Sequence, residues 1–191
     1  MNSFFALLFR QKFITRWGLM RSVTPESLSE HTAECAVIAH ALALIGNTYY
    51  GKSYDPDRVA SLALFHDAPE VFTGDLPTPI KYFSDETKSD YAILEQHAID
   101  TLVSKLPEEL RPIYSSLLSP TEEDAESMKL VKIADKLCAY IKCLTEEAAG
   151  NRDFVSARKS TEAILDGIDS PELDYFRKNL LTAFSLTIDE M

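Results

Sequence analysis

The sequence predicts an all-α fold in a single compact domain spanning residues 1–191. Glycine occurs only 6 times in 191 residues, which is too few for the frequent turns of a β-sandwich or β-barrel. Apolar residues recur at helical spacing along most of the chain, and no long segment alternates apolar and polar residues. With 46% hydrophobic residues, a chain of this length can bury a sizeable core around central helices.

The first expected element is an amphipathic helix over residues 2–15. An apolar stripe runs roughly along one side of it, formed by Phe5, Leu8, Phe9 and Phe13. We expect this stripe to dock on the core. The next segment, RWGLMRSVTPES, breaks the periodicity and is expected to be a loop.

The second helix has two candidate starts in the segment TPESLSEH. The proline suits a first helical position after the threonine, whereas Ser27 with Glu30 three residues later fits a capping box. From residue 35 to residue 45 the pattern is apolar on nearly all sides apart from His40. We therefore expect this helix to be the central, buried one.

A third helix is expected over residues 56–70, starting after Asp55. Pro69 falls near its end and lacks a backbone N–H, so we expect the helix to kink or stop there. The following segment, TGDLPTPIKY, is expected to be a loop that Pro77 and Pro79 hold extended.

The second half of the chain reads as further helices joined by short loops. A long helix should run from a Thr121 cap to about residue 149, because Gly150-Asn151 is a typical helix end. The other expected helices cover residues 85–106, 107–118, 153–167 and 171–186.

Composition restricts the function and the compartment. A formal net charge of -11 leaves few cations to neutralise a phosphate backbone, which argues against long nucleic acids but not against a small phosphorylated ligand. The three cysteines lie in apolar stretches without a C-x-x-C pair, as expected of buried free thiols in a reducing compartment. The N-terminus lacks the features of a signal peptide, and no apolar run is long enough to span a membrane. We expect a soluble cytoplasmic protein.

The segment LALFHDAPEVFTGD places polar side chains in an apolar wall. In a helix, Glu70 would lie on the same side as His66 and Asp67, at spacings of four and three residues. Burying these groups without partners would cost several kcal/mol. A divalent cation would compensate for that cost.

Two further residues complete a candidate metal site. His31 begins the central helix, and Asp135 interrupts the most apolar part of the long helix. Taken alone, each could be an ordinary core or surface residue, but all of them interrupt apolar helices. Two imidazoles and two carboxylates suit Mn, Fe, Co, Ni or Zn better than a closed structural zinc site. His40 faces away from His31, and His97 lies on a mostly polar helix, so we exclude both.

The order of a lone histidine, a His-Asp doublet and a distant aspartate resembles the HD-domain superfamily of metal-dependent phosphohydrolases. The surrounding segments RWGLMRSV, SLSEHTAECA, FHDAPEVFTGDLPTPIKYF, VKIADKLCAYIKCLTEEAAGN and ELDYF resemble the bacterial 5'-deoxynucleotidases of the YfbR type along nearly the whole chain. This resemblance implies a helical HD fold, a homodimer, and hydrolysis of deoxyribonucleoside 5'-monophosphates to deoxynucleoside and phosphate. It also implies one divalent transition metal per chain, with Co or Mn activating in vitro and Zn, Fe and Ni compatible.

The resemblance also implies roles for individual residues. The metal ligands would be His31, His66, Asp67 and Asp135. The substrate-binding residues would be Arg16, Trp17, His31, Asp67, Asp75, Leu76, Pro77, Thr78 and Asp135. Arg16 would orient the phosphate, and Glu70 would act as general acid or base. The sugar side of the pocket would be lined by residues 75–78.

Two other classes of function stay open from the residues. One is another HD phosphohydrolase, acting on cyclic nucleotides, nucleoside triphosphates or alarmones. A triphosphate would require more basic residues near the site than Arg16 and Lys81 offer. The other class is a non-catalytic helical protein that binds a structural metal, which would lose its fold on chelation.

Overall fold

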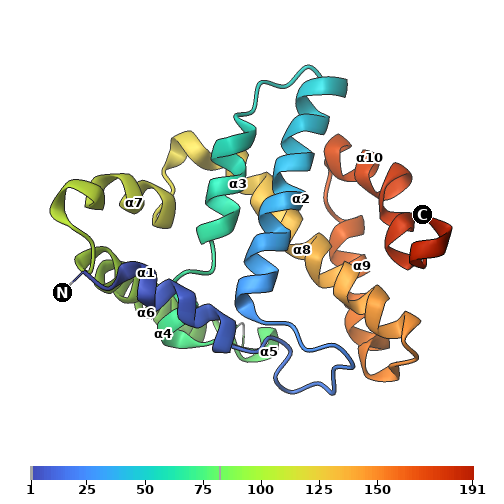
Figure 1. The fold of residues 1–191 in the computed structure, drawn as a ribbon, viewed down its shortest axis with the longest axis horizontal. Helices are drawn as coiled ribbons and strands as arrows, with labels where there is room; N and C mark the ends of the chain where they lie inside the picture. Colours follow the sequence, from blue (N-terminus) through green and yellow to red (C-terminus); the bar gives the residue numbers. More distant parts are fainter. Residues whose placement is uncertain (1, 82) are drawn as a thin grey trace.

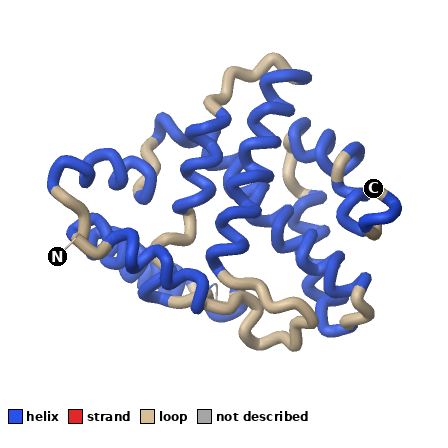
Figure 2. Tube along the Cα trace, in the orientation of Figure 1, coloured by secondary structure: helices blue, strands red, loops and turns tan. Residues whose placement is uncertain are grey.

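A computed structural model describes residues 2–81 and 83–191, with only the backbone at Thr78 and Pro79. The described part is helical and contains no strand, which confirms the all-α prediction (Figures 1 and 2). The α-helices are α1 (Phe4–Leu8), α2 (Leu28–Tyr49), α3 (Pro56–Phe65), α4 (Glu70–Thr73), α5 (Thr78–Lys81), α6 (Asp85–Ser104), α7 (Arg111–Leu118), α8 (Ala125–Ala148), α9 (Val155–Asp166) and α10 (Pro171–Asn179). Shorter 3-10 helices are η1 (Phe9–Phe13), η2 (Glu108–Leu110), η3 (Glu122–Asp124), η4 (Arg152–Phe154), η5 (Leu181–Ser185) and η6 (Ile188–Glu190). Among the described residues, no helix is long and apolar enough to cross a membrane.

Helix α2 is the centre of the larger core, as predicted. It packs against α3, α8 and α10 (Figure 1). The buried side chains of this core include Leu42, Leu62, Leu130, Leu137 and Leu173. Burial of these aliphatic side chains fixes α2, α3 and α8 against one another.

A second, smaller core lies beside the first. It is built around Phe4, Ala68, Leu102, Leu106 and Leu118, which come from α1, the turn after α3, and the α6–α7 region. Ala68 belongs to this core although it follows directly on His66 and Asp67. The turn after α3 is therefore fixed by packing on its far side.

The later of the two predicted starts of α2 is the observed one. Ser27 and Glu30 form a capping box, with the Ser27 amide donating to Glu30 Oε2 at 2.7 Å. The segment before it is extended: Thr15 pairs with Ser27 as an isolated bridge, and the Arg16 amide donates to the Glu26 carbonyl at 2.9 Å. This pairing closes residues 14–28 into a loop.

For residues 2–15, the prediction of which side chains pack on the core was wrong. The helix is α only over Phe4–Leu8 and becomes the 3-10 helix η1, so a stripe drawn at 3.6 residues per turn does not continue. Phe9 and Phe13 are 75% and 69% exposed, whereas Phe4 and Gln11 are buried. The element docks through Phe4 and Gln11 instead.

The expected helix over residues 56–70 is also corrected. It ends at Phe65, and residues 66–69 form a turn before α4 begins at Glu70. Pro69 cannot donate a backbone hydrogen bond, and the Glu70 amide donates to the Asp67 carbonyl three residues back. The polar cluster therefore lies in a tight turn and not on the side of a continuous helix.

The remaining boundaries differ by smaller amounts. The loop expected over 73–82 contains the one-turn helix α5, because Pro79 tolerates an early helical position and the Ile80 amide donates to the Pro77 carbonyl at 2.8 Å. Position 82 of that loop lies outside the described residues. The helix expected over 171–186 stops at Asn179 and continues as η5.

Candidate metal centre

Three segments that are distant in the sequence bring the four predicted metal ligands together. His31 lies in the first turn of α2, His66 and Asp67 in the turn after α3, and Asp135 in the middle of α8. His31 Nε2 lies 3.2 Å from Asp135 Oδ1 and 3.6 Å from Asp67 Oδ2. His66 Nε2 lies 3.2 Å from that same Asp67 oxygen. The predicted convergence is present in the structure.

Each histidine directs one ring nitrogen into this cluster. His66 Nδ1 lies 2.6 Å from the Ala63 carbonyl oxygen, so Nδ1–H donates and Nε2 keeps its lone pair. His66 Nε2 is buried and has no hydrogen-bond partner among the described residues. On the other ring, His31 Nδ1 faces Glu26 Oε1 at 3.4 Å. A buried, unpartnered nitrogen beside carboxylate oxygens fits a metal ligand.

The cluster carries an excess of negative charge. Burial lowers the pKa of His66, but Asp67 and Asp135 outweigh it and raise that pKa to about 9. Burial also disfavours the charged form of Asp135, yet contacts with His31 and Lys136 hold its pKa well below the ordinary 3.8. Surroundings that stabilise a positive charge on an imidazole stabilise a divalent cation for the same reason.

Glu70 lies beside the predicted ligands as the first residue of α4. It is buried, and its Oε2 has no hydrogen-bond partner in the described structure. Burial, followed by the charges of Asp67 and Asp75, raises the pKa of Glu70 to about 8. A carboxyl group in this range can hold or release a proton near neutral pH, as a general acid or base must. Pro69 occupies the helical turn position directly before it.

Arg16 reaches the cluster from the extended segment before α2. Its side chain is 12% exposed, and Nη1 lies 3.7 Å from Asp67 Oδ2 and 3.9 Å from Asp75 Oδ1. A guanidinium at this place can bind phosphate oxygens beside the metal ligands. The prediction that Arg16 faces the site is therefore consistent with the structure.

Trp17 has an unusual backbone conformation next to Arg16. Its φ is 59°, and no other non-glycine residue that the structure describes has a positive φ. Such a conformation costs about 1–3 kcal/mol and is often found at functional sites. The indole packs against Phe154 with ring centroids 5.3 Å apart, and its Nε1–H donates to Glu26 Oε2 at 2.7 Å. Trp17 therefore lies at the edge of the site, and its hydrogen bond to Glu26 connects it to His31 and Arg16.

The predicted sugar-side segment is only partly placed beside the cluster. Asp75 faces Arg16, as given above, while Leu76 and Pro77 are half-buried. The side chain of Thr78 lies outside the described residues. Of the two excluded histidines, His40 is 40% exposed near Asp57, and His97 is exposed on α6.

Sequence reasoning missed two residues of the site. Glu26 contacts Arg16, Trp17 and His31, but it lies in a loop whose path the sequence did not reveal. Cys35 is a buried free thiol, as predicted, yet its Sγ lies 3.5 Å from His31 Nε2. Its spacing of four residues from His31 on one helix was the signal that could have identified it.

The donor set fits a transition metal. One ligand atom each from His31, Cys35, His66 and Asp135 lie within 4.8 Å of one another. Imidazole and carboxylate ligands suit Mn, Fe, Co, Ni and Zn, and a nearby thiol favours the softer members of that group. The carboxylates of Asp67 and Asp135 would offset the charge of a divalent ion.

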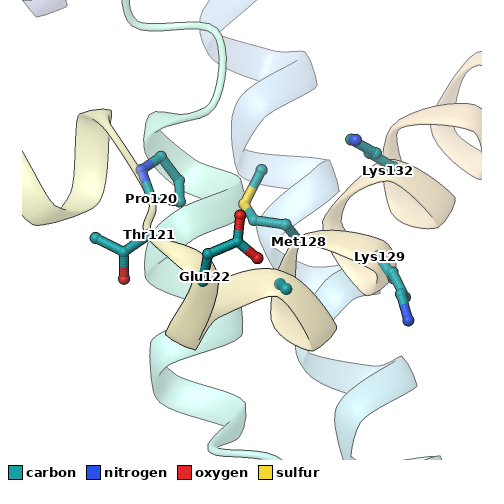
Figure 3. A pocket seen from close by; sticks show the side chains of 7 residues that line it. Pro120, Thr121, Glu122, Met128, Lys129 and Lys132 are labelled. Atoms are coloured by element: carbon teal, nitrogen blue, oxygen red, sulfur yellow. The ribbon is translucent and has the colours of Figure 1, made fainter.

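A surface hollow lies away from this cluster. It has a volume of about 530 Å³ beside the start of α8, and Pro120, Thr121, Glu122, Met128, Lys129 and Lys132 line it together with Ala125 (Figure 3). It includes none of the predicted metal ligands. The titratable cluster, and not the size of a hollow, marks the candidate site.

Comparison with known proteins identifies the family of the chain. The sequence model of the 5'-deoxynucleotidase YfbR-like family matches residues 3–184. The chain is 47% identical over 190 residues to 5'-deoxynucleotidase YfbR of Escherichia coli, covering 100% of this chain and 96% of that protein. The YfbR protein of Shigella boydii matches equally well.

Solved structures support the fold. An HD-domain phosphohydrolase from Listeria innocua superposes with a TM-score of 0.81 at 24% identity, covering 95% of this chain and 88% of that one. A cyanophage S-2L HD phosphohydrolase bound to dA and one catalytic Zn²⁺ ion superposes with a TM-score of 0.65 at 20% identity, covering 93% and 95%. With the family model matching almost its entire length, this chain belongs to the YfbR-like family of 5'-deoxynucleotidases.

Proposed function

We propose that this protein is a metal-dependent 5'-deoxynucleotidase that hydrolyses deoxyribonucleoside 5'-monophosphates to deoxynucleoside and phosphate. The observation that carries the proposal is the convergence of His31, His66, Asp67 and Asp135, with Arg16 Nη1 3.7 Å from Asp67. The names of the relatives, 5'-deoxynucleotidase YfbR, support the substrate class.

The ligand set would hold one divalent cation per chain, and cobalt or manganese is the activating metal we propose. When bound, such an ion would supply charge stabilisation for the phosphate oxygens and a water molecule of lowered pKa as the nucleophile. Arg16 binds the remaining phosphate oxygens and balances their charge. Glu70 either accepts a proton from the attacking water or donates one to the leaving sugar oxygen, a role its unpartnered buried oxygen supports.

A deoxy sugar would be selected by residues 75–78. Asp75 lies 3.9 Å from Arg16, the residue proposed to bind the phosphate, which supports a place for this segment beside the nucleotide. A 2'-hydroxyl would clash there or leave a buried polar group unpaired. Among the described residues, Arg16 and Lys136 are the cations that pair with Asp67, Asp75 and Asp135, and this small positive charge disfavours a triphosphate substrate.

The assay compares paired substrates. Phosphate release is measured from dAMP against AMP and from dTMP against UMP, with Co²⁺ or Mn²⁺ and with an EDTA control. We expect hydrolysis of the deoxy member of each pair, abolished by EDTA. Equal rates on both members would remove the selective role of residues 75–78, and no release from any monophosphate would refute the proposed substrate class.

We also propose that the enzyme is a cytoplasmic homodimer. The three free, buried cysteines support a reducing compartment. Val37 and Leu44 on α2 are 69% and 45% exposed on either side of His40, which gives α2 an apolar outer face that a second copy could cover. Light scattering of the purified protein tests this: a monomeric mass at micromolar concentration would refute it.

A further inference from the structure

Glu26 is a buried carboxylate that links three different residues of the site. It is 8% exposed and directly precedes the Ser27 cap of α2. Its Oε1 lies 3.4 Å from His31 Nδ1 and 3.3 Å from Arg16 Nε. Its Oε2 accepts the Trp17 indole N–H at 2.7 Å. One side chain thus faces a metal ligand, the phosphate-binding arginine and the strained residue beside it.

We propose that Glu26 is a positioning residue that sets the metal-ligating ring of His31 and the guanidinium of Arg16 in one fixed arrangement. This inference rests on the function proposed above, because it gives Arg16 and His31 the roles assigned there. Glu26 itself touches neither metal nor substrate in this scheme. It acts through the side chains that do.

The effect on His31 follows from the two nitrogens of its ring. Glu26 Oε1 lies 3.4 Å from Nδ1, which favours the tautomer that carries its proton on Nδ1 and directs the Nε2 lone pair to Asp67 and Asp135. A carboxylate behind a metal-ligating histidine fixes the ring orientation and increases the basicity of the ligand nitrogen. Without it, the fully buried ring would have Cys35 Sγ as its contact on the same helix.

The effect on Arg16 is one of direction. Arg16 Nε is buried, has no hydrogen bond among the described residues, and lies beside Glu26 Oε1. The ion pair holds the Nε edge of the guanidinium, so Nη1 points toward Asp67 and Asp75. A planar guanidinium held at one edge offers its other donors to phosphate in a fixed geometry.

The backbone reinforces the same connection. The Arg16 amide donates to the Glu26 carbonyl at 2.9 Å, so the two residues pair through both main chain and side chain. Between them the chain turns through Trp17, whose φ is 59°. The hydrogen bond from the Trp17 indole to Glu26 holds this turn closed. Loss of the carboxylate would therefore loosen the whole segment that carries Arg16.

The test uses Glu26→Gln, Glu26→Asp and the matched control Glu30→Gln. Glutamine has the size of glutamate, and its amide oxygen can still accept from Trp17. Its NH₂ group would then face the donors of His31 and Arg16 and repel them. Glu30 is an exposed carboxylate four residues away that bonds Ser27 in the helix cap. Aspartate keeps the charge but is shorter by one methylene.

Three measurements are made on each full-length variant. Calorimetry gives the affinity for Co²⁺ alone, which does not depend on any substrate. The emission of Trp17, the single tryptophan of the chain, reports on the turn and on folding. Steady-state hydrolysis of dAMP at saturating Co²⁺ gives kcat and KM.

We expect Glu26→Gln to weaken Co²⁺ binding by about 10–100-fold and to lower kcat/KM by a similar factor at saturating metal. Glu26→Asp should recover part of both losses, and Glu30→Gln should behave like the wild type. Wild-type Co²⁺ affinity and kinetics in Glu26→Gln would overturn the proposal, as would equal losses in Glu30→Gln. If Glu26→Gln does not fold, an unchanged Co²⁺ affinity in Glu26→Asp overturns it. A wild-type protein inactive on every monophosphate of the paired assay would refute the proposed function, while the Co²⁺ series would still decide the role of Glu26.

Discussion

Replacing Glu146 with glutamine should destabilise the protein and loosen the loop that carries Arg16. Glu146 lies near the end of α8 and is 1% exposed. Its carboxylate accepts hydrogen bonds from the Val23 and Thr24 amides at 2.8 and 3.0 Å, and from Asn151 Nδ2 at 2.7 Å. Lys142 pairs with the same carboxylate. These contacts fasten the middle of the 14–28 loop to α8.

The structure gives the magnitude in two ways. Burial raises the pKa of Glu146, but its hydrogen bonds outweigh burial and lower that pKa from 4.5 to about 2. This difference corresponds to about 3 kcal/mol of stability at neutral pH. Hydrogen bonds to a charged group contribute about 1.5–3 kcal/mol each and are not additive. An amide at this position keeps one acceptor but sets a donor against a backbone N–H, so we expect a loss of about 2–3 kcal/mol.

The pH dependence has a definite sign. Because the pKa of Glu146 is lower in the folded state, its contribution is complete above pH 4.5 and is lost as the pH falls toward 2. The stability difference between wild type and Glu146→Gln should therefore be largest at pH 7 and smaller at pH 3.5. These two pH values lie on either side of the isoelectric point near 4.8, where solubility is lowest.

Urea unfolding at both pH values measures this difference. Glu126→Gln is the control on the same helix, since Glu126 is 63% exposed and surface ion pairs contribute about 0–1 kcal/mol. A loss below about 1 kcal/mol at pH 7, or a difference that grows on acidification, would refute this reasoning. Activity on dAMP should fall as well, because the loop also holds Arg16 and Glu26.

Three further predictions concern the metal centre. Removal of metal with EDTA should abolish hydrolysis but leave the helical circular dichroism signal unchanged, because two apolar cores hold the fold. Loss of that signal would indicate a structural metal instead. Glu70→Ala should lower kcat by about 10²–10⁴-fold with Co²⁺ affinity retained, and full turnover would exclude its proton-transfer role. Asp135→Asn should weaken Co²⁺ binding, measured by calorimetry, by about 10–100-fold or more, because changes to residues behind a metal ligand already cost that much. Unchanged affinity would remove Asp135 from the ligand set.

Much of the fold followed from local signals. Helical periodicity and scarce glycine predicted an all-α chain. The capping box at Ser27 and Glu30 was one of two candidate starts of the central helix and is the one observed. These signals are local because a helix satisfies its own backbone hydrogen bonds within a few residues. The N-terminal element departed from the pattern because its backbone changes to a 3-10 helix after Leu8.

The predicted ligands lie together although the predicted backbone around His66 and Asp67 was wrong. His66, Asp67 and Asp135 stood out as polar residues in apolar surroundings, and burial forces such groups to find partners. The turn at residues 66–69 replaced the expected helix side, yet the same side chains converge. The polar side chains in an apolar segment identified these residues, and this signal is the same whether the backbone is a helix or a turn.

The sequence by itself determined the helical class and the family, and it predicted four metal ligands whose side chains lie together in the structure. Only the tertiary structure revealed Glu26 beside His31 and Arg16, Cys35 beside the candidate metal ligands, and Glu146 fastening the loop to α8. The contacts of Glu26 depend on the path of a loop, and those of Glu146 join residues more than 100 positions apart. No local propensity encodes such contacts, because they exist only once the packing of α2, α3 and α8 has placed the loop against them.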